Sequence, residues 1–160
     1  MPNEHRVKLD GHAYTRHPAG RHVGIVASRF NDSVTRRLVD GAVECLRSHG
    51  VEDSAIDVYW VAGSFELPQM AAKLVRDGRC EGIVALGTLI RGETSHFDVL
   101  ANSVAAALES LGVEGPVPVT FGVITAENMD QAVDRAGGKH GNLGRNAALS
   151  LVEMMSHWRQ

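Results

Sequence analysis

Short apolar runs alternate with amphipathic stretches from residue 22 to the end of the chain, and this alternation limits the possible folds more than any other feature. Runs that are almost wholly apolar occupy residues 22–27, 56–62, 81–90 and 117–125. Each is followed by a stretch with apolar residues every three or four positions, which is typical of an α-helix. Strands that alternate with helices in this way form right-handed βαβ units around a parallel sheet.

The predicted strands are continuously apolar rather than alternating between apolar and polar residues. Strands of this kind are buried on both faces, so helices must cover both sides of the sheet. The amphipathic stretches predict helices at residues 31–49, 67–78, 95–111, 127–136 and 145–158. We therefore predict an α/β fold, a three-layer α/β/α sandwich with a four-stranded parallel sheet.

A length of 160 residues corresponds to one domain, and a formal net charge of −3 argues against a general nucleic-acid-binding protein. We expect residues 1–20 to form a polar N-terminal arm and residues 21–160 to form the domain. No apolar run is long enough to span a membrane, and the first twenty residues have no secretion signal. The sequence therefore predicts a cytoplasmic protein without membrane or nucleic-acid partners.

The chain has two cysteines, Cys45 and Cys80, which lie far apart and form no CxxC motif. They are predicted to be buried thiols rather than a disulfide or a zinc site. The histidines of the arm lack the regular spacing and the acidic partners of a metal site. No metal ion is expected.

Ligands of open parallel sheets bind beyond the carboxyl ends of the strands, where the strand-to-helix loops meet. The first such loop has no GxGxxG motif, and the chain contains no GxxxxGK[ST] motif. Ser64 in the second loop is not part of a GxSxG motif. A nicotinamide cofactor, a P-loop nucleotide and a serine nucleophile are therefore not expected.

Residues of the first two loops each fit two roles. Phe30 is either a hydrophobic staple against the following helix or a stacking platform for a flat heterocycle. Asn31 is expected to cap that helix. Glu66 either favours the positive end of the helix that it precedes or accepts hydrogen bonds from a polyol or an amine. The local pattern leaves both alternatives open for Phe30 and for Glu66.

The third loop, residues 87–98, leaves a buried strand, turns at a glycine and enters a helix. The unpaired N–H groups at the start of a helix suit a phosphate. His96 in the first turn is either a solvated histidine or a proton-transfer group, and the nearby glycine and hydroxyls favour catalysis. Arg135, near the end of a later helix, fits a phosphate contact or a partner for the helix C-terminus. Spacing does not decide between these two roles.

Five motifs together, in order along residues 22–155, resemble the lumazine synthase family. They are RFN at 29–31, GSFELP at 63–68, GTLIRGETSHFD at 87–98, FGVIT at 121–125, and RAGGK at 135–139 with GN at 141–142. The resemblance implies a flavodoxin-like fold and the penultimate reaction of riboflavin biosynthesis. In that reaction 5-amino-6-(D-ribitylamino)uracil and 3,4-dihydroxy-2-butanone 4-phosphate give 6,7-dimethyl-8-ribityllumazine, phosphate and water. No cofactor or metal is implied.

The resemblance also implies roles for individual residues. The implied contacts to the pyrimidine and the ribityl chain are Phe30, Ser64, Phe65, Glu66, Thr88, Leu89, Ile90 and, from the adjacent subunit, Phe121. The implied phosphate contacts are Gly92, Glu93, Thr94 and Arg135. His96 matches the proton-transfer histidine of the family. Leu143 departs from the family, which often has lysine there, so we assign that position no phosphate role.

Members of the resembled family assemble as homopentamers, and some pack twelve pentamers into an icosahedral shell of sixty subunits. The link at residues 137–144 has no insertion, as in the shell-forming members. Two other classes remain open: a non-catalytic protein that binds lumazine or flavin, and a mainly shell-forming structural protein. The presence of both His96 and Arg135 speaks against the first of these.

Overall fold

The computed structural model of the chain describes residues 22–158, so the predicted arm at residues 1–20 lies outside the described residues. The strands are β1 (His22–Ser28), β2 (Ile56–Val61), β3 (Cys80–Ile90), β4 (Val119–Ala126), β5 (Ala136–Gly138) and β6 (Gly141–Asn142). The α-helices are α2 (Asp32–Ser48), α3 (Leu67–Arg76), α4 (His96–Glu114), α5 (Met129–Asp134) and α6 (Leu143–Trp158). Two short 3₁₀ turns, η2 (Asp53–Ala55) and η3 (Ser64–Glu66), precede β2 and α3.

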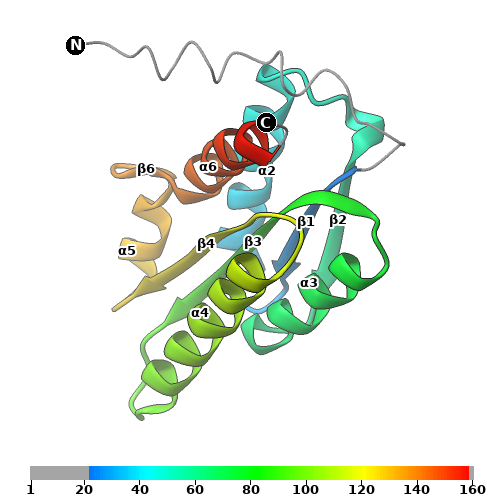
Figure 1. Cartoon of the computed structure of the whole chain (residues 1–160). Helices are drawn as coiled ribbons and strands as arrows, with labels where there is room; N and C mark the ends of the chain where they lie inside the picture. Colours follow the sequence, from blue (N-terminus) through cyan, green and yellow to red (C-terminus); the bar gives the residue numbers. More distant parts are fainter. Residues whose placement is uncertain (1–21, 159–160) are drawn as a thin grey trace, which may run out of the picture.

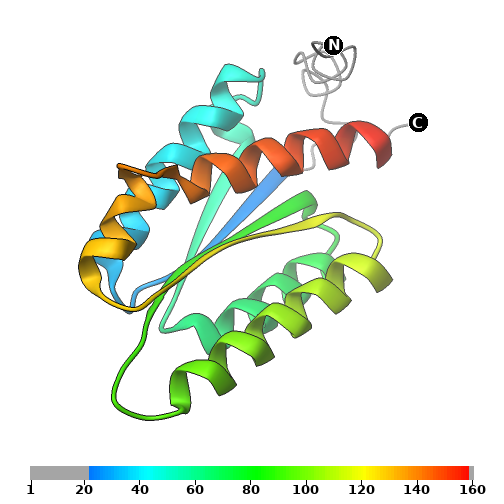
Figure 2. The same cartoon turned by 90° about the vertical axis from the view of Figure 1, so that its left-hand side faces the viewer.

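The first four strands form one sheet in the order β2-β1-β3-β4, and every neighbouring pair is parallel (Figure 1). In this register Val26 of β1 lies between Tyr59 of β2 and Ala85 of β3. Helices α2 and α6 cover one face of the sheet, and α3 and α4 cover the other (Figure 2). The predicted α/β, flavodoxin-like sandwich with a four-stranded parallel sheet is therefore confirmed.

Two hydrophobic clusters, one on each face, hold the three layers together. Ile25 and Leu86 point into the cluster under α2 and α6, whereas Val26 and Ala85 point into the cluster under α3 and α4. Neighbouring residues of a strand face opposite sides of a sheet, so a strand between two cores must be apolar throughout. All of β3 is buried except its last residue, Ile90, which is half-buried. Within residues 22–158, no helix is both long enough and apolar enough to cross a bilayer.

The structure differs from the sequence prediction mainly after β4. The helix predicted at residues 127–136 is only α5, and the glycine-rich link that follows it pairs as the short antiparallel strands β5 and β6. Gly137 has φ 100° and Gly141 has φ 78°, values that favour glycine and allow the tight reversal. Strands of three and two residues are too short to show a repeating pattern of apolar residues, so the sequence predicted only a loop here.

The two cysteines lie in the core as predicted. Cys45 and Cys80 are each 1% exposed, and both are free thiols. Burial raises the pKa of the Cys45 thiol and raises that of Cys80 to about 11. A thiol with a raised pKa is a poor nucleophile at neutral pH, so both cysteines act as packing residues.

Helices α2 and α6 approach so closely that a backbone contact replaces side-chain packing. Gly144 in the first turn of α6 lies against the backbone of Leu38, and a Cβ at position 144 would overlap the Leu38 carbonyl. Next to it, Asn142 Nδ2 donates to the carbonyl oxygen of Arg37 at 3.0 Å. The glycine therefore sets the distance between the two helices that cover one face of the sheet.

We expect Gly144→Ala to destabilise the protein by about 3 kcal/mol, because the added methyl group must push α2 and α6 apart. Gly112→Ala in α4 is the matched control, since a Cβ there would lie 3.5 Å from Val119, an ordinary contact. This control should be neutral or stabilising by up to about 1 kcal/mol, because alanine favours a helix. Thermal unfolding of both variants measures the difference. Equal melting temperatures would mean that the close approach does not limit stability.

Candidate active site

A cavity of about 340 Å³ opens at the carboxyl ends of β1, β2 and β3. The loops that follow these strands gather at one edge of the sheet (Figure 2). The lining residues come from those loops and from the start of α4: Phe30, Asn31, Gly63, Ser64, Phe65, Leu89, Ile90, Gly92, Thr94, His96, Phe97 and Leu100. The cavity lies where ligands of parallel sheets are expected to bind.

The cavity joins many of the residues singled out in the sequence and leaves others outside. The predicted site residues that line it are Phe30, Ser64, Phe65, Leu89, Ile90, Gly92, Thr94 and His96. Those that do not line it are Glu66, Thr88, Glu93, Phe121 and Arg135. Asn31, Gly63, Phe97 and Leu100 also line it, although the sequence prediction did not assign them to the site.

Two phenylalanines with exposed side chains stand at the cavity. Phe30 is 70% exposed and Phe65 is 59% exposed. A hydrophobic staple would be covered by the helix that follows, so the exposure of Phe30 argues against that role. Exposed aromatic faces beside a cavity can stack on a flat ring system.

Asn31 stands at the N-cap position of α2, yet its side chain makes no capping hydrogen bond. Instead its Nδ2 donates to the carbonyl oxygen of Thr88 at 3.0 Å, which ties the loop after β1 to β3. The backbone of Asn31 is left-handed, with φ 61°, a region that asparagine tolerates better than most residues. Thr88 itself is buried, and its hydroxyl lies 2.9 Å from that of Thr35. The predicted side-chain cap is therefore wrong.

Glu66 stabilises the turn that begins α3. Its Oε1 accepts a hydrogen bond from the backbone N–H of Gly63 at 2.9 Å. This bond closes the 3₁₀ turn η3, which presents Ser64 and Phe65 to the cavity. The contact is structural, but it differs from the predicted one: Glu66 makes no side-chain capping bond to α3 and bonds the backbone before η3 instead.

Beneath the cavity the packing around Gly87 leaves no room for a side chain. A Cβ at this position would lie 2.8 Å from Ser28 Oγ and 2.9 Å from Ser64 Oγ. Ser28 is fully buried, and its hydroxyl has no hydrogen-bond partner among the described residues. Gly87 thus lets the ends of β1 and β3 and the η3 turn come together under the site.

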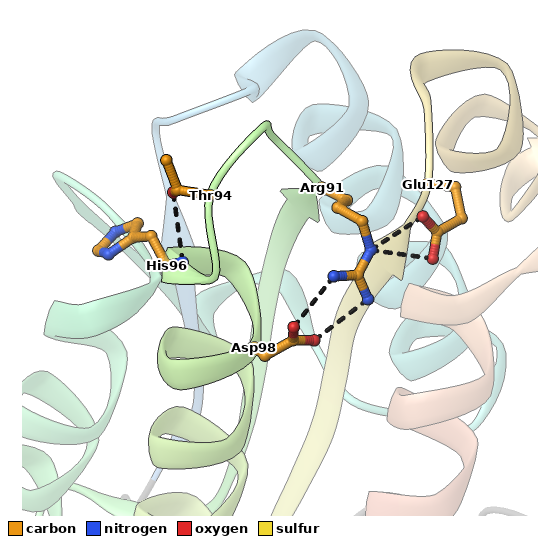
Figure 3. Close-up of polar contacts among 5 residues, drawn as sticks. All are labelled: Arg91, Thr94, His96, Asp98 and Glu127. Carbon is orange, nitrogen blue, oxygen red and sulfur yellow. Dashed lines mark hydrogen bonds and ion pairs between the residues drawn. The ribbon is translucent and has the colours of Figure 1, made fainter.

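His96 is the first residue of α4, and its backbone N–H donates to Thr94 Oγ1 at 3.3 Å. Figure 3 shows its imidazole pointing away from Arg91 and Asp98. The helix that begins here has 19 residues, so its dipole makes this end favourable for an anion. The histidine that the sequence predicts as a proton-transfer group therefore lies at a helix N-terminus.

Arg91, at the end of β3, pairs with two carboxylates (Figure 3). Its Nη1 and Nη2 donate to Asp98 at 3.0 and 3.1 Å, and its Nε donates to Glu127 at 2.9 Å. Hydrogen bonds from Arg91 lower the pKa of Asp98, and those to Asp98 and Glu127 raise the pKa of Arg91. Because the Asp98 pKa is lowered, this pair is intact at neutral pH and is lost only as the pH falls through that lowered pKa.

A larger open groove of about 880 Å³ runs between α3 and α4. Its walls include Val61, Met70, Ala107 and Leu111, with Lys73 among them. Apart from Glu66, none of the predicted site residues lines this groove. In residues 22–158, no three His, Cys, Asp or Glu side chains are grouped so that they could hold a metal ion.

The four-stranded parallel sheet with helices on both faces defines a flavodoxin-like α/β fold, and the cavity lies at the carboxyl ends of its strands. Residues 20–159 match the family model described as 6,7-dimethyl-8-ribityllumazine synthase. The chain belongs to this family, so the resemblance seen in the motifs is confirmed, and with it the predicted activity as a lumazine synthase of riboflavin biosynthesis.

Two relatives carry the same name, 6,7-dimethyl-8-ribityllumazine synthase. The protein of Pediococcus pentosaceus is 47% identical over 133 residues, which cover 83% of this chain and 85% of the relative. The protein of Chlorobium phaeobacteroides is 45% identical over 141 residues, which cover 88% of this chain and 91% of the relative. The similarity therefore extends over nearly the whole of each protein.

We expect Asn31→Ala to destabilise the protein by about 2 kcal/mol, because it removes the bond to Thr88 and places alanine in the left-handed region. Asn31→Gly is the matched control, since it removes the same bond but tolerates φ 61°. Asn31→Gly should lower the free energy of unfolding by only about 1 kcal/mol. Thermal or denaturant unfolding separates the two contributions. If the glycine variant were the less stable one, the backbone conformation would not be the main cost.

Proposed function

We propose that the cavity at the carboxyl ends of β1, β2 and β3 is where the chain condenses 5-amino-6-(D-ribitylamino)uracil with 3,4-dihydroxy-2-butanone 4-phosphate. The observation that carries this proposal is the lining of one cavity. It includes both the exposed ring of Phe30 and His96 at the N-terminus of α4. A flat pyrimidine suits the aromatic ring, and a phosphate suits the helix N-terminus.

The chemistry needs positioning more than it needs reactive protein groups. The amine of the pyrimidine attacks the ketone to give an imine, phosphate leaves by elimination, and the ring closes. Orientation of two bound reactants supplies on the order of 7 kcal/mol or more of the acceleration. One proton shuttle, which we assign to His96, adds about 10²-fold to 10⁴-fold.

At the pyrimidine end, Phe30 stacks on the ring, and the η3 turn holds the ribityl chain through Ser64 and Phe65. Glu66 does not line the cavity and acts by holding this turn. The backbone of Leu89 and Ile90 at the end of β3 faces the uracil edge. Thr88 lies directly before them, and its carbonyl already accepts a hydrogen bond from Asn31. We therefore expect Thr88 to hold the rim of the cavity in place more than to contact the substrate.

At the phosphate end, Gly92, Glu93 and Thr94 form the loop that leads into α4. Position 92 is open, with no atom within 4 Å of where a Cβ would lie. The backbone N–H groups of this loop and of the first turn of α4 supply the hydrogen bonds that a phosphate needs. Leu143, the first residue of α6, is uncharged and has no proposed phosphate contact.

Phe121 and Arg135 take part only if a second subunit supplies them. Phe121 lies on the edge strand β4 and is 41% exposed, and Arg135 is exposed at the end of α5. Neither lines the cavity of its own chain. We propose that both reach the cavity of a neighbouring subunit in a homopentamer, alone or as part of an icosahedral shell. The free buried thiols suit the reducing cytoplasm, where we place the protein.

Incubation of the wild-type chain with both substrates, followed by lumazine fluorescence and phosphate release, tests this function. We expect equal amounts of the two products. In His96→Ala, turnover should fall by about 10²-fold, because a proton shuttle is lost. The affinity for the pyrimidine should stay within about threefold, since positioning does not depend on the imidazole.

Binding of the pyrimidine by the wild-type chain without product would support the non-catalytic alternative. Assembly without binding would support a purely structural role. Unchanged turnover in His96→Ala would remove this residue from the mechanism.

Arg135→Ala should raise the KM for the phosphorylated ketone by about 10-fold to 100-fold, the value of a hydrogen bond to a charged group. The KM for the pyrimidine should change little. Co-assembly of Arg135→Ala chains with His96→Ala chains tests where the arginine comes from. If neighbours share each site, random mixing leaves about a quarter of the sites intact, and activity returns. If both residues served one chain's own cavity, mixing would restore nothing.

A further inference from the structure

Three segments that lie far apart in the chain meet at the side chain of Arg91. Arg91 follows β3, Asp98 lies in the first turn of α4, and Glu127 follows β4 (Figure 3). The contact with Asp98 uses both terminal nitrogens of the guanidinium, and the contact with Glu127 uses Nε. The flat face of the guanidinium also lies 4.6 Å from the centre of the Phe97 ring.

The backbone of Arg91 is fixed as well as its side chain. Its N–H donates to the carbonyl oxygen of Ala126 at 2.8 Å, where β4 ends. Arg91 is thus tied to Ala126 and Glu127 at the end of β4, and to Phe97 and Asp98 in the first turn of α4. A guanidinium that already donates to two carboxylates is not free to bind a phosphate, although it lies beside the proposed phosphate loop.

The loop between Arg91 and α4 is anchored at its two ends. Residues 92–95 are all exposed, so no buried side chain anchors the middle of the loop. The side chain of Arg91 spans from the first end of the loop to Phe97 and Asp98, just past the second end. One side chain thus links the two ends of the loop that carries Thr94 and leads into His96.

We propose that Arg91 is a positioning residue: through Asp98 and Glu127 it holds the loop at residues 92–95 and the imidazole of His96 in the geometry that phosphate elimination requires. This inference rests on the proposed function of the cavity. The clamp, meaning Arg91 with Asp98 and Glu127, acts on the phosphate end and leaves the pyrimidine end at Phe30 and Ser64 untouched.

In Arg91→Gln we expect kcat to fall and the KM for the phosphorylated ketone to rise, each by about 10-fold, because small misplacements of reacting groups are costly. The KM for the pyrimidine should change by less than about threefold. Arg91→Lys should restore only part of the loss, since one ammonium cannot reproduce the planar fork to Asp98 and also reach Glu127. Asp98→Asn should show a similar defect, and the double variant should be less than additive.

Arg47→Gln is the matched control. Arg47 also pairs with an aspartate through two nitrogens, Nε and Nη2 to Asp53, but on the link between α2 and β2. Both pairs are exposed, so both variants remove an arginine–aspartate pair of the same kind. The control should leave both KM values and kcat unchanged.

Hydrogen exchange of the hydrogen-bonded backbone amides of His96, Asp98 and Val99 tests the clamp without reference to activity. We expect faster exchange in Arg91→Gln than in the wild type, and no change in Arg47→Gln. If the wild type makes no lumazine, the proposed function fails, and the exchange experiment still decides whether the clamp holds the loop. Unchanged exchange in Arg91→Gln would overturn the inference. An equal rise in both KM values with a lowered melting temperature would also overturn it, because it would indicate a general loss of stability.

Discussion

Strand β3 is buried on both faces and pairs with both β1 and β4, and the site depends on where this strand ends. Its burial holds the sheet between the helix layers, because successive side chains of β3 pack into the two hydrophobic clusters in turn. Its last residues, Leu89 and Ile90, line the cavity. Gly87 lets the loops from β1 and β2 approach at this point, since any side chain would displace Ser28 and Ser64. The packed core thus holds the loops after β1, β2 and β3 together at the cavity.

The two ends of the cavity are built differently. The proposed pyrimidine end rests on short, well-anchored turns: Asn31 is bonded to Thr88 on β3, and Glu66 closes the turn that carries Ser64. The proposed phosphate end is an exposed loop whose ends are linked by Arg91. Such a division suits a condensation of two reactants, because a large flat substrate gains from a preformed surface, whereas a phosphate needs free N–H groups that point outward.

The sequence predicted the fold well because two local signals, the continuously apolar runs and the helical periodicity, indicate the same fold. It also predicted most of the cavity, since the carboxyl ends of parallel strands must converge. It missed the bond from Asn31 to Thr88, because a left-handed backbone turns that side chain away from its own helix. It missed the partnership of Arg91 with Glu127, which lies 36 residues away and comes close only through the pairing of β3 with β4. The sequence around Phe121 and Arg135 does not indicate whether these side chains would reach the cavity of their own chain or that of a neighbouring subunit.

The pairing of Arg91 gives the two sides of the phosphate loop opposite polarity. One guanidinium between two carboxylates leaves a net charge of −1 at the end of β4 and on the flank of α4 that carries Asp98. The N-terminus of α4 beside His96 presents the positive end of the helix dipole. In the proposed complex, a dianionic phosphate would be repelled by the two carboxylates and attracted to the helix N-terminus. The ion pairs that anchor the loop would then also direct the charged end of the ketone toward the imidazole of His96.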